Sequence, residues 1–324
     1  MTERRPTPAG VAAAAKRIAP YVTRTPLLPL EWQGKQVWVK AECLQQGGSF
    51  KLRGAFNRLV QLSEAERSRG VVAFSSGNHA QGVAIAARRL GIAATIVMPS
   101  DAPAVKRDST LAAGAEIVAY DRATESREAI GARLAEEKGC VLVPSFDDVD
   151  VIEGQGSAGI EIAEQLGANP DHVLVPCGGG GLSAGLALAL PGTRIVTVEP
   201  EGWDDMARSL EAGVPVPVRE PPPATRCDAL QTRLVSPLTL DALREAGAVG
   251  TSVTEAEIER AMAFAARHLR IVAEPGGAVA LAALLAGKAG ALSGRTVVVV
   301  SGGNVDPAAY ADILARQATA DRRG

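Results

Sequence analysis

Residues 172–190 read HVLVPCGGGGLSAGLALAL, which is a short apolar run, four consecutive glycines and a run rich in Ala and Leu. This order predicts a strand over His172–Val175, a tight turn at Gly178–Gly181 and a helix over Leu182–Leu190. Consecutive glycines let a backbone fold closely around an anion, and the helix that follows aims its free N–H groups at it. The segment therefore predicts a phosphate site, although the lysine and the Ser or Thr of a P-loop are missing.

The same alternation of strand and helix continues in both directions along the chain. Short β-branched runs predict further strands at Gln36–Lys40, Val71–Phe74, Ala94–Met98, Glu116–Ala119, Val141–Val143, Arg194–Val198 and Thr296–Val300. Amphipathic runs predict further helices at Phe50–Leu62, His79–Leu90, Val105–Ala113, Glu125–Glu137, Ile152–Leu166 and Glu255–His268. Repeated strand–helix–strand units predict an α/β fold with parallel or mixed sheets flanked by helices, in which ligands bind where strands end.

The composition excludes several classes of protein. A chain of 324 residues is long enough for two lobes. A net charge of −2 gives no basic surface for nucleic acid. The N-terminus carries no apolar signal core, and Ala278–Ala286 is too short to span a bilayer, so we expect a cytoplasmic protein without membrane contact. Four scattered cysteines and three histidines without metal spacing predict neither a disulfide framework nor a zinc hydrolase site.

Three further segments carry chemistry. Residues 47–55 read GGSFKLRGA and put Lys51 in the first turn of a predicted helix. The positive end of the helix lowers the pKa of the Lys51 amine, which suits an amine that forms a Schiff base. Residues 75–82, SSGNHAQG, form a second anion cradle at a helix start. Residues 301–306, SGGNVD, offer a hydroxyl to a ring nitrogen. The plainer alternatives are a surface lysine, a packed histidine at His79 and a simple turn at 301–306.

The glycine turn also supports a second interpretation. Gly179-x-Gly181-x-x-Ala184 matches the dinucleotide fingerprint, and Glu199 ends a strand about twenty residues on, where a ribose-binding acid is expected. On this segment alone an NAD-dependent oxidoreductase is a fair hypothesis, and the other three segments argue against it.

Together, the four segments resemble the fold-type-II pyridoxal 5′-phosphate (PLP) enzymes, in particular serine/threonine dehydratases and eukaryotic-type serine racemases. The resemblance runs from about Tyr21 to Leu314 and rests on the order and spacing of four motifs at 49–54, 76–82, 178–182 and 301–304. Residues 144–148, PSFDD, and 274–277, EPGG, also look like this group. The resemblance implies a two-domain fold like that of the tryptophan synthase β subunit. Residues 43–146 would form the small domain, and residues 1–42 plus 147–324 would form the large PLP-binding domain.

The resemblance also implies roles for the matching residues. Lys51 carries PLP and moves the α-proton of the substrate. The other cofactor contacts are Phe50 against the ring, Asn78 at the phenolic oxygen, Gly178, Gly179, Gly180, Gly181 and Leu182 at the phosphate, and Ser301 at the pyridine nitrogen. Ser75, Ser76 and His79 lie around the substrate carboxylate, and Arg127 joins them on closure.

These parts predict a PLP-dependent ammonia-lyase. It would convert a small β-hydroxy amino acid of the L-threonine or L-serine type into a 2-oxo acid and ammonia. A racemase stays open as an alternative, because Ser76 matches the residue that racemases of this family use as a second base. A hydroxyaspartate-type dehydratase also stays open, as does a catalytically dead regulator that binds an amino acid or PLP.

The acidic strand end at 199–205, EPEGWDD, has a better explanation than ribose binding. It resembles the divalent-cation site of the racemase-like members, with the carboxylates of Glu199 and Asp205 and the carbonyl of Trp203 as ligands. Oxygen ligands suit Mg²⁺ or Ca²⁺, and a solvated acidic turn is the plainer alternative. The resemblance also leads us to expect a small amino-acid substrate and a homodimer or higher homo-oligomer.

Overall fold

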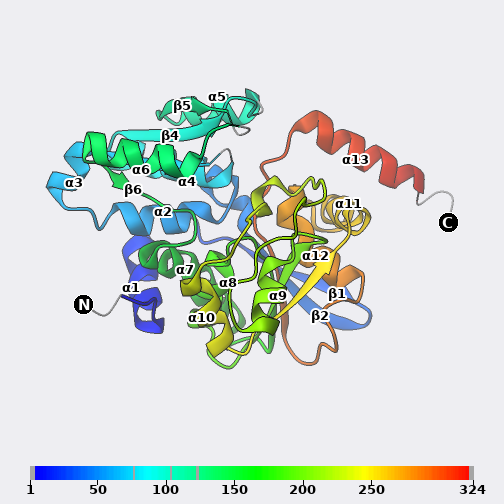
Figure 1. The fold of residues 1–324 in the computed structure, drawn as a ribbon. Coiled ribbons are helices and arrows are strands. Elements are labelled where there is room, and N and C mark those ends of the chain that lie inside the picture. The colour runs from blue at the N-terminus through cyan, green and yellow to red at the C-terminus, as the bar shows by residue number, and fades with distance from the viewer. Residues whose placement is uncertain (1–3, 76, 103, 122–123, 321–324) are drawn as a thin grey trace.

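The computed structural model describes residues 4–75, 77–102, 104–121 and 124–320, which form two β-sheets flanked by helices (Figure 1). The larger sheet has the strand order β1 (Leu27–Trp32), β2 (Lys35–Ala41), β10 (Thr296–Val300), β7 (His172–Pro176), β8 (Arg194–Pro200) and β9 (Val249–Val253). Strand β1 pairs antiparallel with β2, and the other neighbours are parallel. The sheet is therefore mixed.

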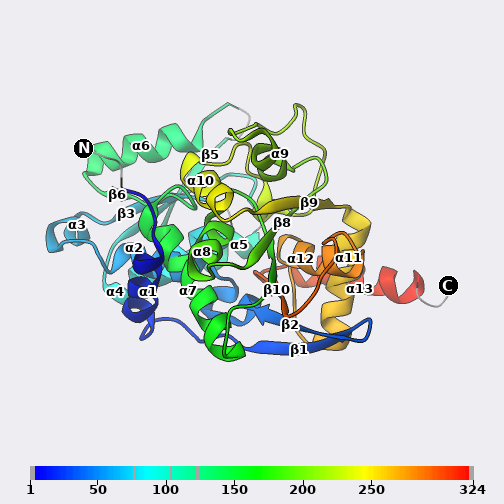
Figure 2. The same ribbon diagram turned by 90° about the horizontal axis from the view of Figure 1, so that it is seen from below.

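Alternate residues of the larger sheet pack against two different sets of helices. Val298 and Val300 belong to the core of α11 (Glu255–Phe264) and α12 (Pro275–Leu285), on which α13 (Pro307–Ala320) also packs. Val297 and Val299 face the core of α7 (Val149–Leu166), α8 (Gly181–Ala189) and α10 (Pro237–Glu245). Figure 2 shows α8 and α12 on opposite sides of the sheet, as the alternation of side chains in a strand requires.

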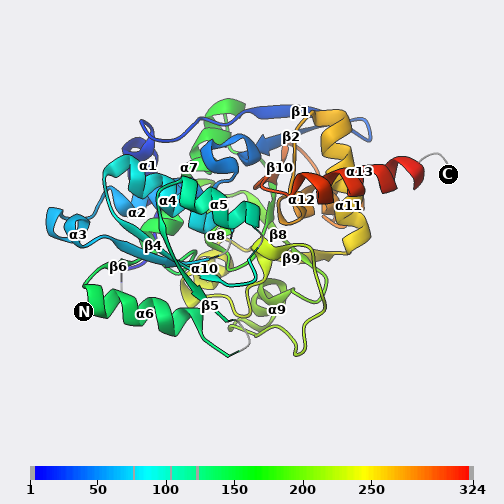
Figure 3. The same cartoon turned by 90° about the horizontal axis from the view of Figure 1, so that it is seen from above.

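The smaller sheet is parallel throughout, in the order β5 (Glu116–Tyr120), β4 (Ala94–Pro99), β3 (Val71–Phe74) and β6 (Val141–Leu142). Helix α6 (Arg127–Lys138) covers one face, and α4 (Asn78–Leu90) and α5 (Ala104–Ala112) lie on the other (Figure 3). Helix α2 (Lys51–Leu59) packs against both α4 and α7. It therefore joins the lobe of the smaller sheet to the lobe of the larger one.

The α/β fold class and the predicted strands and helices are confirmed, with small shifts at their ends. The predicted helix over Glu255–His268 is wrong at its end, because it gives way to a π-helical turn at Ala265–Leu269. Strands β1 and β9 and several helices were not predicted: α1 (Pro8–Ile18), α3 (Glu64–Arg69), α9 (Asp205–Ala212), α10, α12 and α13. Both strands lie at sheet edges, and β1 contains Pro29, which is tolerated there.

The division into domains at 43–146 stays a prediction. The strands of the smaller sheet lie within 71–142, and those of the larger sheet lie within 27–41 and 172–300. Among the described residues, no helix combines the length and the apolar character needed to cross a membrane.

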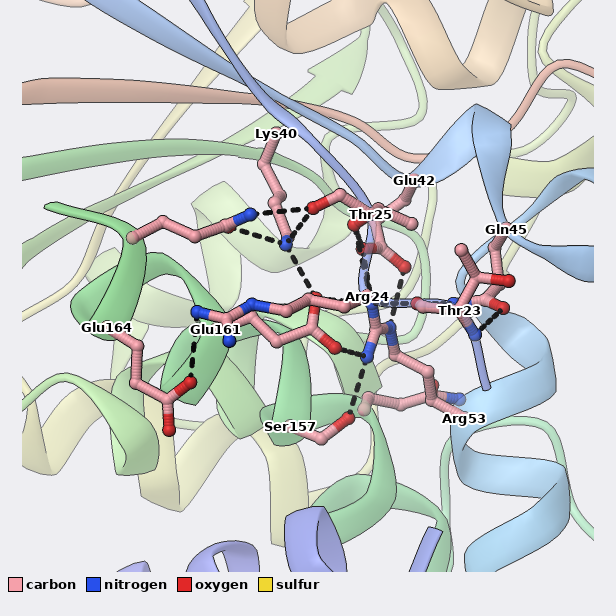
Figure 4. Close-up of polar contacts among 12 residues, drawn as sticks. Thr23, Arg24, Thr25, Lys40, Glu42, Gln45, Arg53, Ser157, Glu161 and Glu164 are labelled. Carbon is pink, nitrogen blue, oxygen red and sulfur yellow. Dashed lines mark hydrogen bonds and ion pairs between the residues drawn. The ribbon is translucent and has the colours of Figure 1, made fainter. Parts of the chain in front are cut away.

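A buried ion network fastens α2 to the larger lobe (Figure 4). The guanidinium of Arg53 is fully buried and pairs with Glu42 at 2.7 Å and with Glu161 of α7 at 2.7 Å. Glu161 also accepts a 2.6 Å bond from the buried ammonium of Lys40 on β2. Although burial alone raises the pKa of Glu42, the Arg53 charge lowers it below its usual range. Two positive and two negative charges thus balance at this junction.

We predict that Arg53→Met lowers the free energy of unfolding by about 3–5 kcal/mol, because it leaves the buried Glu42 carboxylate without its partner. Urea denaturation measures the change. Arg24→Met is the matched control, since its 3.1 Å pair with Glu164 joins two side chains that are each 55% exposed and should cost less than about 1 kcal/mol. Equal losses in the two variants would contradict the assignment.

Candidate active site

Five α-helices with a described start have an N-cap residue whose side chain makes no cap hydrogen bond, and all five begin at motifs singled out in the sequence. They are α2 at Lys51, α4 at Asn78, α8 at Gly181, α9 at Asp205 and α12 at Pro275. At α9 the carboxylate of Glu199 already accepts from the N–H groups of Met206 and Ala207. Seven other helices have side-chain caps, from Thr7, Ser63, Ser126, Asp148, Ser236, Thr254 and Asp306. An uncapped helix start offers its N–H groups and the positive end of its dipole to an anion. The uncapped starts therefore mark where anionic groups can bind.

The segment that begins at Ser301 brings the starts of α2 and α12 together. The backbone N–H of Phe50 donates to the Ser301 carbonyl at 3.1 Å, and Ser49 and Gly302 form an isolated β-bridge. On the other side, the N–H of Glu274 donates to the Gly302 carbonyl at 3.0 Å. A Cβ on Gly302 would lie 2.0 Å from Glu274 Oε1, so only glycine fits there. Ser301 is buried between these elements.

Lys51 is the first residue of α2, and its side chain is half-buried. Its Nζ donates to the Ser145 carbonyl at 2.7 Å and lies 5.2 Å from the centre of the Phe50 ring. Burial lowers the pKa of the Lys51 amine to about 8. About a tenth of the amine is therefore uncharged at pH 7, far more than for a solvated lysine, and the uncharged form is the nucleophile.

The glycine turn is tightly packed against Phe146 and Thr239. Gly180 has a φ of 87°, which favours glycine, and Thr239 Oγ1 donates to the Gly179 carbonyl at 2.8 Å. A Cβ on Gly179 would lie 2.3 Å from the Phe146 ring, and one on Gly181 would lie 3.1 Å from Phe146 Cβ. The turn thus has the form of a backbone cradle for an anion at the start of α8, where Leu182 is also buried.

Asn78 is held by side chains from the opposite lobe. Its amide nitrogen donates to Glu274 Oε1 at 2.5 Å, and its amide oxygen accepts from Asn304 at 2.8 Å. Burial raises the pKa of Glu274 to about 7, while the Asn78 hydrogen bond and the charge of Lys106 act against that rise. The orientation of the Asn78 amide is therefore fixed, and its second N–H remains for another acceptor.

Three of the four predicted substrate residues are described, and each makes a local contact. His79 is buried, with Nε2 at 2.8 Å from the Val143 carbonyl, and burial followed by the Lys51 charge lowers its pKa to about 3. Ser75 Oγ accepts from the Gly77 N–H at 3.1 Å. Arg127 is exposed, pairs with Glu128 and stands 5.7 Å from the Phe74 ring. Ser76 lies outside the described residues, and the roles of all four stay predictions.

The predicted cation ligands lie at the start of α9. Glu199 is buried and accepts from the N–H groups of Met206 at 2.9 Å and Ala207 at 2.8 Å, so it cannot face a ribose. Both carboxylate oxygens of Asp205 are buried without a hydrogen-bond partner in the described part of the chain. Burial raises the pKa of Asp205 to about 7. Trp203 is buried, and its indole donates to the Pro223 carbonyl at 2.8 Å.

Comparison with known proteins identifies the class of enzyme. The family model described as "Pyridoxal-phosphate dependent enzyme" matches residues 18–303. The chain therefore belongs to this family, and the prediction of a fold-type-II PLP enzyme is confirmed.

Named relatives fall within the predicted group. The chain is 45% identical to an L-threo-3-hydroxyaspartate ammonia-lyase from Pseudomonas sp, over 94% of this chain and 97% of the relative. It is 38% identical to a serine racemase from Schizosaccharomyces pombe, over 96% and 98% of the two chains. The crystal structure of a threonine deaminase from T.th. has a TM-score of 0.84 and 43% identity, covering 93% of this chain and 99% of that one.

The residues present fit PLP. The glycine cradle, whose Gly179 has no room for a Cβ, suits the phosphate, and the partly neutral Lys51 suits the aldehyde. Glu274, Asn304 and Phe146 were not among the cofactor contacts predicted from the sequence. Residues 144–148 and 274–277 were noted as similar to the family, and that signal could have found Phe146 and Glu274.

We predict that Gly179→Ala reduces the PLP bound at limiting cofactor by at least about tenfold, because its Cβ would displace Phe146 and distort the cradle. Absorbance of the dialysed protein measures the bound PLP. Gly192→Ala, in the turn beyond the other end of α8, meets no neighbour but is strained by its φ of 83°, so it controls for a loss of stability that arises away from the cradle. Equal PLP content in Gly179→Ala and wild type would rule out this cradle as the phosphate site.

We also predict that PLP attaches to the apoprotein faster as the pH rises, with a midpoint near the pKa of about 8 of Lys51. The reason is that only the uncharged amine attacks the aldehyde. Burial lowers the pKa of the Lys51 amine from 10.5, so the uncharged form appears at a lower pH. Stopped-flow absorbance across a pH series gives the midpoint. A midpoint near that of a solvated lysine would mean that Lys51 is not buried in the apoprotein.

Proposed function

We propose that the protein is a PLP-dependent ammonia-lyase that removes water and then ammonia from a small L-β-hydroxy amino acid. The observation that carries the proposal is the partly neutral Lys51 amine at the uncapped start of α2. The similarity to an L-threo-3-hydroxyaspartate ammonia-lyase and a threonine deaminase favours hydroxyaspartate, threonine and serine as the substrates to test.

When bound, PLP supplies an electron sink for the substrate Cα. In this proposal the amine of Lys51 holds the cofactor and then takes the proton from Cα. The N–H groups at the start of α4 bind the substrate carboxylate, because that start has no side-chain cap. The remaining N–H of Asn78 would hold the phenolic oxygen of the cofactor, and the hydroxyl of Ser301 would hold its pyridine nitrogen.

Racemisation is the second candidate function, favoured by the similarity to a serine racemase. A racemase must move protons on both faces of Cα, and one lysine reaches only one face. The sequence offers Ser76 as the second base. Dehydration of an L-substrate needs only Lys51, so the two reactions can be separated by substitution at Ser76.

The test is a panel of L-threo-3-hydroxyaspartate, L-threonine and L-serine, with 2-oxo acid and ammonia measured together and D-serine measured by chiral chromatography. We expect 2-oxo acid and ammonia in equal amounts from at least one substrate, and none from Lys51→Ala. Ser76→Ala should keep most of the 2-oxo acid formation and lose any D-serine formation.

Two outcomes would contradict the proposal. Full activity of Lys51→Ala would remove the assignment of the lysine. A PLP-loaded wild type without turnover on any of the three substrates would favour a binding protein over an ammonia-lyase.

We further propose a divalent cation, Mg²⁺ or Ca²⁺, at Glu199, Asp205 and the Trp203 carbonyl. The support is the pair of buried Asp205 oxygens without hydrogen-bond partners in the described structure, beside the buried Glu199 carboxyl. Burial raises the pKa of both carboxyl groups, and a divalent cation would allow both to ionise. Among the described residues no cluster of three or more His, Cys, Asp or Glu side chains could hold a metal. The proposed set has only two carboxylates, so a backbone carbonyl and water would complete it.

For the cation we predict a loss of thermal stability in a chelator and its recovery with Mg²⁺ or Ca²⁺. At one hundred times the dissociation constant, a ligand specific for the native state adds about 2.7 kcal/mol. Asp205→Asn should abolish the response, whereas Asp204→Asn should retain it, because Asp204 pairs with Arg208 at 3.5 Å. If neither the chelator nor the cation changes the melting temperature of the wild type, the site is excluded.

A homodimer or higher homo-oligomer and a cytoplasmic location complete the proposal. Both follow from the resemblance and the composition, and size-exclusion chromatography with light scattering tests the first.

A further inference from the structure

The hydroxyl of Thr239, a fully buried residue of α10, is hydrogen-bonded to the glycine turn. Its Oγ1 donates to the carbonyl oxygen of Gly179 at 2.8 Å, and Gly179 is itself buried. In the described part of the chain, no backbone N–H donates to this carbonyl. The hydroxyl of Thr239 is therefore the donor that satisfies it.

A second acceptor competes for the hydroxyl proton, and it already has a partner. The carbonyl oxygen of Ser236 lies 3.1 Å from Thr239 Oγ1, and it accepts from the N–H of Leu240 at 3.0 Å. The hydroxyl of Ser236, at 3.4 Å, can donate to Thr239 rather than accept. Because a buried carbonyl without a donor is costly, the hydroxyl proton of Thr239 belongs on the bond to Gly179.

The Thr239 side chain also contacts the next glycine of the turn. Gly180 has a φ of 87°, and a Cβ placed on it would lie 2.9 Å from Thr239 Cβ and 2.6 Å from Met206 Cε. Residues 178–181 are all glycine, so the turn has no side chains of its own to restrict its backbone. Its conformation is therefore set by its neighbours, and Thr239 contacts two successive residues of it.

We propose that Thr239 is a positioning residue for the cofactor phosphate. Consecutive glycines can rotate their peptide groups at little cost, and a carbonyl oxygen turned into the cradle would repel an anion. The hydrogen bond to Thr239 commits the Gly179 oxygen to α10 and keeps it out of the cradle. The cradle is thus arranged before the phosphate binds, which lowers the cost of binding it. The inference rests on the assignment of the glycine turn as the phosphate site.

The experiment compares PLP with pyridoxal, which has the same ring and aldehyde but no phosphate. The dissociation constant of each from the apoprotein is measured by absorbance titration. Thr239→Val removes the hydroxyl and should raise the constant for PLP by about tenfold, or about 1.4 kcal/mol, which is within the net worth of one hydrogen bond. The constant for pyridoxal should stay unchanged. Thr239→Ser keeps the hydroxyl and should retain the affinity for PLP.

Thr193→Val is the matched control. Thr193 is also buried, and its Oγ1 donates to the Pro170 carbonyl at 2.7 Å. It directly precedes β8, which runs parallel to β7, so it lies at the end of the sheet opposite the glycine turn. The variant removes the same kind of hydrogen bond far from the cradle and should change neither constant.

The ratio of the two constants separates positioning of the phosphate from a general loss of stability, which would weaken both ligands alike. An equal loss for PLP and pyridoxal, or no loss for either, would overturn the proposal. Should Thr239→Val fold poorly, Thr239→Ala removes the same hydroxyl without adding a methyl group, and the same change in the ratio is expected.

Gly179→Ala distinguishes a failure of this inference from a failure of the phosphate site itself. If Gly179→Ala weakens PLP alone and Thr239→Val changes nothing, the glycine turn binds the phosphate without help from Thr239, and the inference is wrong. If neither variant discriminates between PLP and pyridoxal, the phosphate binds elsewhere, and both assignments are wrong.

Discussion

The buried guanidinium of Arg53 is the contact on which the arrangement of the site depends. Residues 51 and 53 point about 200° apart around a helix, so anchoring Arg53 in the ion network turns Lys51 to the opposite side, where its Nζ donates to the Ser145 carbonyl. Burying charges is costly unless each one is paired. Glu42 and Glu161 supply that pairing from two different elements, so one side chain ties α2 to both residues 42–44 and α7 (Figure 4).

The helix starts are of two kinds, those with a side-chain cap and those without one. Ser, Thr and Asp side chains cap the starts of seven helices, while the N-cap residues of the helices that begin at Lys51, Asn78, Gly181, Asp205 and Pro275 make no side-chain cap bond in the described structure. A cofactor with a phosphate and a substrate with a carboxylate both need free N–H groups. Glu274 is the clearest example. It occupies the N-cap position of α12, yet its carboxyl accepts a hydrogen bond from Asn78 and none from the helix N–H groups.

Most of the fold and the family could be predicted from the sequence, because strand–glycine–helix units carry local signals, while the individual cofactor residues stay predictions. Helix α12 was missed because it is apolar on every side and shows no helical period, and β9, VGTSV, is a polar edge strand. The Arg53 pairs and the Lys106–Asp228 pair join residues far apart in the sequence, so no local pattern reports them. For His79 the structure adds what spacing could not, namely a buried ring beside a carbonyl.

The central claim is that the chain positions one lysine, Lys51, for covalent attachment of PLP. The most direct measurement loads the protein with PLP, reduces it with borohydride, digests it and locates the added cofactor mass by tandem mass spectrometry. We predict the mass on the peptide that contains Lys51, and its absence from that peptide in Lys51→Ala. Stoichiometric labelling of Lys40, Lys106 or any other lysine, with Lys51 unmodified, would contradict the claim.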